Sequence, residues 1–335
     1  MMFSPARVIA RWIAPLVAVA TIATVGSLAH PPQVGPAPSV RLASSDGNPL
    51  AGMPFYVNPN SAAMRAAQQA NPPSPELTLI ANTPQAYWIV PGGSAATVGK
   101  YAGDAAAAGA LPVFSIYGIP HRDCGSYAAG GMGSGAAYRG WIDGIAAGLG
   151  SAPAAVILEP DALAMADCLQ GDQRQERYDL IRYAVEALTR DPNAAVYIDA
   201  GHLRWHSAED MAARLNNAGI ARARGFSVNT ANFYTTEDET GYGEAISGLT
   251  NGSHYVIDTS RNGVGPAPDP DNSWCNPSGR ALGTPPTTAT GGAHADAYLW
   301  VKRPGESDGT CGKGDPAVGT FVTQYAIDLA RTAGR

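Results

Sequence analysis

The sequence predicts a single α/β domain folded as a distorted parallel (β/α) barrel. From residue 53 onward, short apolar runs alternate with alanine-rich amphipathic stretches. Continuous apolar strands separated by helices are typical of a parallel sheet that is covered on both faces. Eight such units over about 280 residues favour a barrel of the TIM type over an open sheet. Because no GxGxxG motif follows an early strand, a dinucleotide-binding fold has little support.

The expected elements follow directly from this alternation. The expected strands are rich in β-branched and aromatic residues and cover 54–57, 86–90, 111–119, 154–160, 194–200, 225–232, 254–260 and 297–302. The expected helices are amphipathic and include 60–70, 136–149, 172–190, 207–217 and 316–333. Helices therefore lie between most of the strands, as crossover connections between parallel strands require.

The first 29 residues have the pattern of a secretory signal peptide. Arg7 and Arg11 precede a long uncharged run that ends in small residues at Ser27 and Ala29. An uncleaved membrane anchor is the alternative, because the run is close to the ~20 residues that a spanning helix needs. Either interpretation places the rest of the chain outside the cytoplasm, secreted or associated with the cell envelope. No later segment is apolar enough to cross a bilayer, so no membrane contact is expected after cleavage.

The remaining chain divides into a linker and one domain. Residues 30–50 carry Pro, Gly and Ser without periodicity, which indicates a flexible Pro-rich linker. Residues 51–335 are then the folded domain.

Composition narrows the partners and the compartment. The formal net charge of −6 argues against a DNA or RNA partner, because nucleic-acid phosphates require a basic surface. Four cysteines in an exported protein indicate two disulfides. Three pairings are possible, and the sequence alone does not choose among them. A zinc site is the weaker alternative, because no CxxC pair occurs.

Polar residues gather where the predicted strands end rather than where they begin. They are Asp123, Asp161, Asp199, Asn229, Asn232, Asp258, Lys302 and Asp308. In a parallel barrel the carboxyl ends of all strands open on one face, where catalytic residues collect. We therefore expect a carboxylate-rich site on that face.

Other chemistries find little support in the motifs. A kinase-like catalytic loop at 121–123 would need an Asn five residues after the Asp, where this chain has Ala128. The G-x-S-x-G elbow of a serine hydrolase does not occur. Metal ligation by His121, His202 and His206 lacks the spacing of a motif such as HExxH. No metal or cofactor is expected.

Tryptophans lie near the same strand ends as the carboxylates. They are Trp88, Trp205, Trp274 and Trp300. Sugars offer hydroxyls that hydrogen-bond carboxylates and apolar C–H faces that stack on aromatic rings, so this combination indicates a carbohydrate site. Glycoside hydrolysis in particular uses a pair of carboxyl groups. Trp141, inside the expected helix 136–149, is instead assigned to the core.

Six motifs, in this order, resemble glycoside hydrolase family 6. They are YGIPHRDCG (117–125), VILEPDAL (156–163), YIDAGHLRW (197–205), SVNTANF (227–233), WCN (274–276) and WVKRPGESDGT (300–310). The resemblance implies a distorted (β/α) barrel and hydrolysis of β-1,4-glucan with inversion at the anomeric carbon. It implies neither a metal nor an organic cofactor.

The resemblance also implies catalytic roles for five residues. Asp161 matches the general acid, and Asp123 matches the neighbouring carboxylate that tunes this acid and helps to hold the nucleophilic water. Asp308 matches the residue usually proposed as the base. Asp199 matches a further carboxylate that supports the site and the substrate, and Tyr117 matches the tyrosine that favours the distorted sugar ring. Inversion predicts an acid and a base roughly 6.5–9.5 Å apart, with room for a water.

Sugar binding and the disulfides follow from the same resemblance. The positions that match sugar-binding residues are Trp88, His202, Trp205, Asn229, Trp274 and Lys302. The cysteines fit the two disulfides of the family as Cys124–Cys168 and Cys275–Cys311, each of which would clamp two loops.

The predicted function is a secreted, inverting endo-β-1,4-glucanase (cellulase), a monomer that takes β-1,4-glucan as its partner. Processive members of the family cover their cleft with long loops, whereas the segment between Cys275 and Tyr298 is short, which favours internal cutting. No carbohydrate-binding module is visible, which favours soluble or amorphous glucan. The glycine-rich loop 124–138 is expected to close over substrate as a mobile lid. The alternatives are a cellobiohydrolase of the same family, a hydrolase of another β-glucan, or a non-catalytic glucan-binding protein.

Overall fold

The computed structural model describes residues 47–268 and 273–334. The predicted signal peptide and most of the predicted linker lie outside the described residues. Leu50, at the end of that linker, is fully buried against the sheet, and Asn48 Nδ2 donates to the carbonyl of Asp296 at 2.6 Å. The folded unit therefore includes the last residues of the predicted linker. Within the two described ranges, no helix is long and apolar enough to span a membrane.

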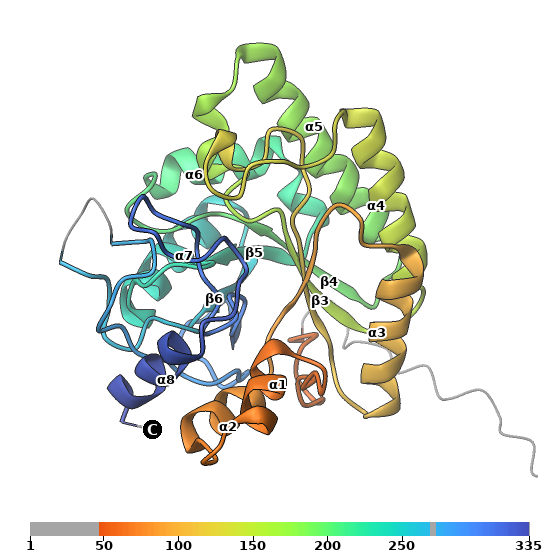
Figure 1. Cartoon of the computed structure of the whole chain (residues 1–335). Helices are drawn as coiled ribbons and strands as arrows, with labels where there is room; N and C mark the ends of the chain where they lie inside the picture. The colour runs from red at the N-terminus through yellow and green to blue at the C-terminus, as the bar shows by residue number, and fades with distance from the viewer. Residues whose placement is uncertain (1–46, 269–272, 335) are drawn as a thin grey trace, which may run out of the picture. The chain divides into compact units, whose positions relative to one another are not determined.

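A parallel sheet that curls into a half-barrel forms the centre of the domain (Figure 1). Its seven strands are β1 (Tyr87–Ile89), β2 (Val113–Ile116), β3 (Ala154–Leu158), β4 (Ala194–Asp199), β5 (Gly225–Val228), β6 (His254–Asp258) and β7 (Ala295–Leu299). The strands lie in sequence order, and every neighbouring pair is parallel. The predicted α/β barrel class is thus confirmed.

Eight α-helices accompany the strands in the described part of the chain. They are α1 (Ala62–Gln69), α2 (Pro75–Ala81), α3 (Ala95–Ala107), α4 (Gly135–Leu149), α5 (Gly171–Leu188), α6 (Ala208–Asn217), α7 (Thr236–Leu249) and α8 (Thr323–Thr332). Six of them begin at a side-chain hydroxyl that accepts a hydrogen bond from the first turn, which satisfies one of its free N–H groups. These caps are Ser61, Ser74, Ser94, Ser134, Ser207 and Thr235.

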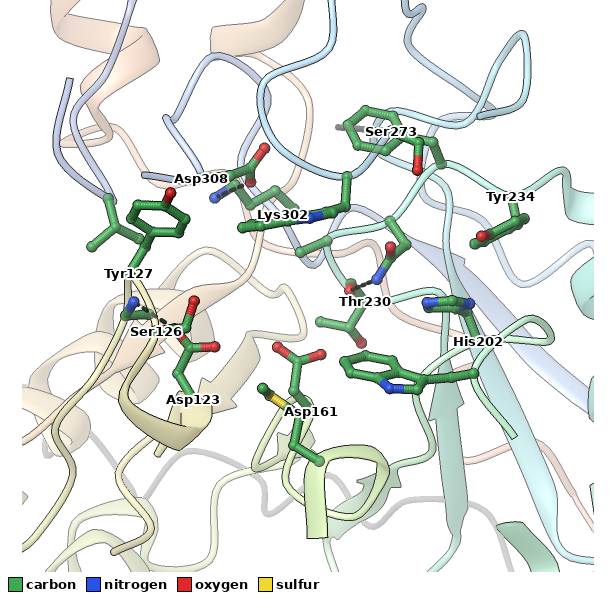
Figure 2. A pocket seen from close by; sticks show the side chains of 18 of the residues that line it. Asp123, Ser126, Tyr127, Asp161, His202, Thr230, Tyr234, Ser273, Lys302 and Asp308 are labelled. Atoms are coloured by element: carbon green, nitrogen blue, oxygen red, sulfur yellow. Dashed lines mark hydrogen bonds and ion pairs between the residues drawn. The ribbon is translucent and has the colours of Figure 1, made fainter. Parts of the chain in front are cut away.

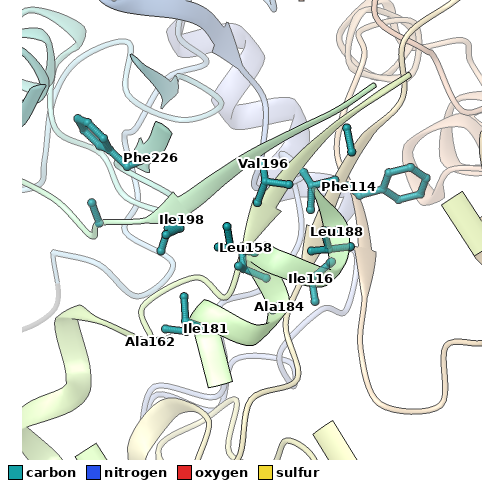
Figure 3. Close-up of a cluster of buried hydrophobic side chains, with 14 of the residues drawn as sticks. Phe114, Ile116, Leu158, Ala162, Ile181, Ala184, Leu188, Val196, Ile198 and Phe226 are labelled. Atoms are coloured by element: carbon teal, nitrogen blue, oxygen red, sulfur yellow. The ribbon is translucent and has the colours of Figure 1, made fainter. Parts of the chain in front are cut away.

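Side chains alternate between two apolar layers along each central strand. In β3, Ala155 and Ile157 face the inside of the half-barrel, whereas Val156 and Leu158 face the helices. Figure 3 shows this outer layer, in which the outward side chains of β2 to β5 meet Ile181 and other residues of α5. Because successive side chains of a strand point to opposite faces, burial of both layers explains why the strands are continuously apolar.

The first expected strand, 54–57, forms a single bridge and not a strand. Phe55 is bridged to Leu111, with one backbone hydrogen bond on each side of the bridge. Pro54 has no N–H to extend the ladder. β1 and β7 are the two edges of the sheet, and they meet at a seam where the Ala86 N–H donates to the Trp300 carbonyl at 3.0 Å.

Four helices depart from the expected pattern. α2, α3 and α7 are absent from the expected helices. α3 and α7 contain internal glycines, which weaken a helical signal. α8 begins at Thr323 and not near 316, because Pro316 and Gly319 precede it in a turn.

Candidate active site

A cleft of ≈ 510 Å³ opens at the carboxyl ends of the strands. Nine of the predicted site residues line it: Trp88, Tyr117, Asp123, Asp161, His202, Trp205, Trp274, Lys302 and Asp308. Figure 2 shows Asp123 and Asp161 pointing into this space on one side, with Asp308 and Lys302 on the other. The two other predicted residues, Asp199 and Asn229, do not line the cleft.

Asp161 lies just beyond the end of β3 in an unusual backbone conformation. Its φ is 68°, and that of Glu159 is 53°, both in the left-handed region that side chains rarely adopt. Such residues cost about 1–3 kcal/mol each and persist only when their surroundings hold them. Here the buried Glu159 carboxylate accepts hydrogen bonds from the Gly118 and Ile119 N–H groups, at 2.9 and 3.0 Å. The strained turn aims Asp161 into the cleft.

Asp199, at the end of β4, holds Asp161 from behind. Its Oδ1 accepts from the Asp161 N–H at 2.9 Å and from the Gly201 N–H at 3.0 Å, while Oδ2 accepts from Ser227 Oγ at 3.0 Å. Burial raises the pKa of Asp199 to about 6. Burial, followed by the charges of Asp199 and Asp123, raises the pKa of Asp161 well above its ordinary value. Asp161 therefore keeps its proton under conditions in which exposed carboxyl groups have lost theirs.

Asp123 lies in a tight turn after β2, with φ of 57°. Its Oδ2 accepts from the Ala128 N–H at 2.6 Å, and burial raises its pKa. Arg122 donates to the carbonyls of Ala128 and Tyr117, at 2.7 and 2.9 Å, and its guanidinium lies 4.6 Å from the Tyr117 ring centroid. Together with the disulfide at Cys124, these contacts hold the first half of the predicted lid loop against the domain.

Asp308 has the opposite electrostatic environment. Arg261 Nη1 lies 2.7 Å from its Oδ2, and Lys302 Nζ lies 2.9 Å from its Oδ1. Burial alone would raise the pKa of Asp308, but the charges of Arg261 and then Lys302 hold it below the ordinary value. The backbone around Asp308 is fixed by Asn276, whose Oδ1 accepts from the Asp308 N–H at 2.7 Å. The pKa values of Asp308 and Asp161, which line the same cleft, are thus shifted in opposite directions.

Aromatic residues form the walls of the cleft. The Trp88 and Tyr117 rings meet edge to face at 5.4 Å between centroids. His202 lies between Trp205 and Tyr234, at 5.1 and 4.5 Å. Burial lowers the pKa of His202 to about 4, so the imidazole is neutral at the cleft wall. These surfaces can stack on sugar rings while the polar edges hydrogen-bond the hydroxyls.

Two predictions for strand-end residues need correction. Asn229 is fully buried; its Nδ2 donates to the carbonyls of Tyr234 and Asp258, at 3.0 and 2.9 Å. It therefore holds the loop under the cleft and does not line the cleft itself. Trp300, expected at the sugar-binding face, is 1% exposed, donates to the Thr284 carbonyl at 3.0 Å and packs in a separate core with α1, α2 and α8. Asp199 supports Asp161, as expected, but from beneath the cleft.

Sequence reasoning missed Arg261 and gave Asp258 no role. Arg261 is fully buried, stacks at 4.3 Å on the Phe233 ring and donates to the Ala231 carbonyl, besides pairing with Asp308. Asp258, at the end of β6, accepts from the backbone N–H groups of Ala231 and Lys302 at 2.9 and 2.8 Å. The position of Asp258 at a strand end was a signal in the sequence that it belongs to the site. Arg261 lies in no motif, so nothing in the sequence indicates its role.

Arg177 of α5 is a second missed residue. It is 2% exposed, and its guanidinium donates to the carbonyls of Ala162, Pro120 and His121, at 2.8, 2.9 and 3.1 Å. These carbonyls belong to the loops that carry Asp161 and Asp123. One buried cation therefore joins the two loops from outside the sheet.

Both predicted disulfides are present. Cys124 is bonded to Cys168 and Cys275 to Cys311, with Cα–Cα distances of 6.2 and 6.1 Å. The alternative of a zinc site built on these cysteines is therefore wrong.

The sequence profile described as "Glycosyl hydrolases family 6" matches residues 50–333. This chain belongs to that family. Among its relatives, Endoglucanase A of Cellulomonas fimi is 46% identical over 286 residues, which are 83% of this chain and 61% of that protein. Endoglucanase 1 of Streptomyces halstedii is 43% identical, over 82% of this chain and 88% of that protein. The family 6 chain thus spans less than two thirds of the Cellulomonas relative.

Solved structures extend this similarity to the family 6 fold. The endoglucanase Cel6 from Mycobacterium tuberculosis, in complex with methyl-cellobiosyl-4-deoxy-4-thio-β-D-cellobioside, is 72% identical with a TM-score of 0.85, over 86% of this chain and 100% of that one. The endoglucanase Cel6B from Humicola insolens is 26% identical with a TM-score of 0.73, over 85% of this chain and 98% of that one.

Proposed function

We propose that this family 6 protein is an endo-β-1,4-glucanase that cuts internal bonds of cellulose or a related β-glucan with inversion. The observation that carries the proposal is the placement of two carboxyl groups in one cleft with opposite surroundings. Asp308 is paired with Arg261 and Lys302, which lower its pKa. Asp161 is buried near Asp199 and Asp123, and these surroundings raise its pKa. Glycoside hydrolysis by inversion needs one protonated and one ionised carboxyl group.

In this mechanism Asp161 donates its proton to the glycosidic oxygen as the bond to the anomeric carbon breaks. A water attacks that carbon from the opposite face of the sugar ring and passes its proton to the base. Asp308 acts as this base, and Asp123 holds the water and raises the pKa of Asp161. Lys302 and Arg261 keep Asp308 ionised, and the walls at Trp88 and Trp205 stack on the sugars.

Internal cutting is favoured over release of cellobiose from chain ends. Four relatives named endoglucanase are 42–46% identical to this chain and the endoglucanase Cel6 is 72% identical, whereas Probable 1,4-beta-D-glucan cellobiohydrolase C of Aspergillus terreus is 32% identical. The two disulfides suit an oxidising compartment, and together with the signal-like first 29 residues they support secretion. A monomer without cofactor is sufficient for the chemistry above.

The test is hydrolysis of carboxymethylcellulose, followed by both reducing ends and viscosity. Internal cutting predicts a steep viscosity fall for few bonds broken. Asp161→Asn removes the general acid and lowers kcat at least ~100-fold, since general acid catalysis contributes about 10²–10⁴. Asp172→Asn, on the exposed first turn of α5, is the matched control and keeps wild-type activity.

Two outcomes oppose the proposal. Full activity of Asp161→Asn would remove the acid assignment, and release of reducing ends without viscosity loss would favour the cellobiohydrolase alternative. NMR of the first product tests the stereochemistry, because inversion of a β-linkage yields the α anomer.

A further inference from the structure

Two large aromatic side chains touch each other at the rim of the cleft while remaining exposed. Tyr127 is 43% exposed and Trp274 is 42% exposed, and both line the cleft. Their ring centroids are 5.9 Å apart, with the ring planes tilted by 41°. The contact therefore lies where substrate must enter and not in a core.

The contact joins loops from distant strands. Tyr127 lies in the loop after β2 and Trp274 in the segment after β6, and three strands separate β2 from β6 in the sheet. Cys124 and Cys275, close to the two aromatics in sequence, are both in disulfides, so each loop has a fixed point beside its aromatic residue. The pair consequently reaches across the cleft from two anchored loops.

Tyr127 also lies against catalytic segments. A Cβ atom added at Gly309, next to Asp308, would come within 2.6 Å of the Tyr127 Cβ, so the tyrosine packs directly on that backbone. The following residue, Ala128, donates its N–H to Asp123. Within the described ranges, neither Tyr127 Oη nor Trp274 Nε1 has a hydrogen-bond partner, so the two side chains meet through their rings without a polar contact.

A sugar cannot lie between the two rings. Carbon atoms in contact are about 3.5–4.0 Å apart, so a sugar held between two aromatic faces needs roughly 7–8 Å. The observed 5.9 Å is shorter. A glucan chain must pass beneath the pair, or the pair must part.

We propose that Tyr127 and Trp274 form an aromatic bridge over the cleft, which the interior of a long glucan must open before it reaches Asp161. Short oligosaccharides pass beneath the bridge by an end, so Tyr127 is a specificity-determining residue for access of long chains. The inference rests on the proposed glucanase function, which names a glucan as the ligand. It adds that Tyr127 controls how a long glucan enters the cleft.

The test measures association rates by stopped-flow tryptophan fluorescence in the Asp161→Asn background, where no hydrolysis interferes. The probes are cellotetraose and high-mass hydroxyethylcellulose. Tyr127→Ala raises the association rate of the polymer at least threefold and that of cellotetraose less than twofold. Tyr127→Phe keeps the ring and matches the parent. Trp274→Ala removes the other ring of the bridge. It raises the ratio of the polymer association rate to the cellotetraose association rate, as Tyr127→Ala does.

The outcomes separate this proposal from the proposed function. Equal effects of Tyr127→Ala on both probes, or none on the polymer, contradict the bridge. The ratio of the two association rates, polymer over cellotetraose, can depend on Tyr127 while the wild-type protein hydrolyses neither probe. That result contradicts the glucanase assignment and leaves the bridge intact. A shift in Tyr127→Ala that Tyr127→Phe reproduces shows that the hydroxyl is responsible and also contradicts the bridge.

Discussion

Replacement of Arg261 by methionine tests how Asp308 is kept ionised. The change removes the guanidinium 2.7 Å from Asp308, the hydrogen bond to the Ala231 carbonyl and the stacking on Phe233, all within a fully buried site. Breaking a buried ion pair from one side costs about 3–5 kcal/mol. Because Lys302 still neutralises Asp308, we expect the lower part of that range, about 3–4 kcal/mol of unfolding free energy.

The variant also changes the pH dependence of activity. Arg261 lowers the pKa of Asp308, so its loss raises that pKa and the acidic limb of the rate profile moves to higher pH. Thermal unfolding by circular dichroism measures the stability part, with an expected fall in Tm of ~6–8 °C at about 2 °C per kcal/mol. The control is Arg222→Met, which breaks an exposed pair with Glu186, worth at most about 1 kcal/mol. Equal Tm changes in the two variants, with an unmoved acidic limb, would refute the reasoning.

Three further predictions concern the supports of the site. Asp199→Asn removes a charge that raises the pKa of Asp161, so the alkaline limb of the kcat/KM profile moves to lower pH; an unmoved limb contradicts this. Arg177→Met loosens the loops that carry Asp161 and Asp123, so kcat falls at least tenfold while KM changes less than threefold. A change in KM alone would contradict a positioning role for Arg177. Joint replacement of Cys275 and Cys311 by serine opens a link of sequence separation 36 and costs about 3–4 kcal/mol in urea unfolding; a loss below 1 kcal/mol contradicts that.

The sheet and the carboxylates of the cleft could be predicted from the sequence for a physical reason. Parallel strands buried on both faces must be apolar throughout, so a carboxylate such as Asp161 at a strand end stands out from its surroundings. The common polarity of parallel strands then brings Asp123, Asp161 and Asp308 to one edge, whatever their separation in the chain. Family motifs supplied the roles and the disulfide pairing, which spacing alone left open.

The remaining features depend on backbone geometry that no local pattern encodes. Asn229 resembles a sugar-binding strand-end amide, but its φ of 65° turns the side chain under the loop toward Asp258. Arg261 and Arg177 lie on segments without a motif, and their acceptors are mostly backbone carbonyls of remote loops, which every residue type supplies. The contact between Tyr127 and Trp274 forms only because two loops meet in space, so neither sequence segment predicts it.

The seam of the half-barrel is joined by few hydrogen bonds, and we expect it to open more readily than the rest of the sheet. At this seam the Ala86 N–H bonds the Trp300 carbonyl at 3.0 Å and Trp88 Nε1 bonds the Val301 carbonyl at 2.8 Å, in place of a strand ladder. Local opening should therefore cost less free energy here than between ladder-paired strands, and amide hydrogen exchange should be fastest along these two edges. Trp88 and Lys302 lie on opposite sides of the seam, and both line the cleft. Local opening of the seam would therefore change the width of the cleft that a glucan meets at that end.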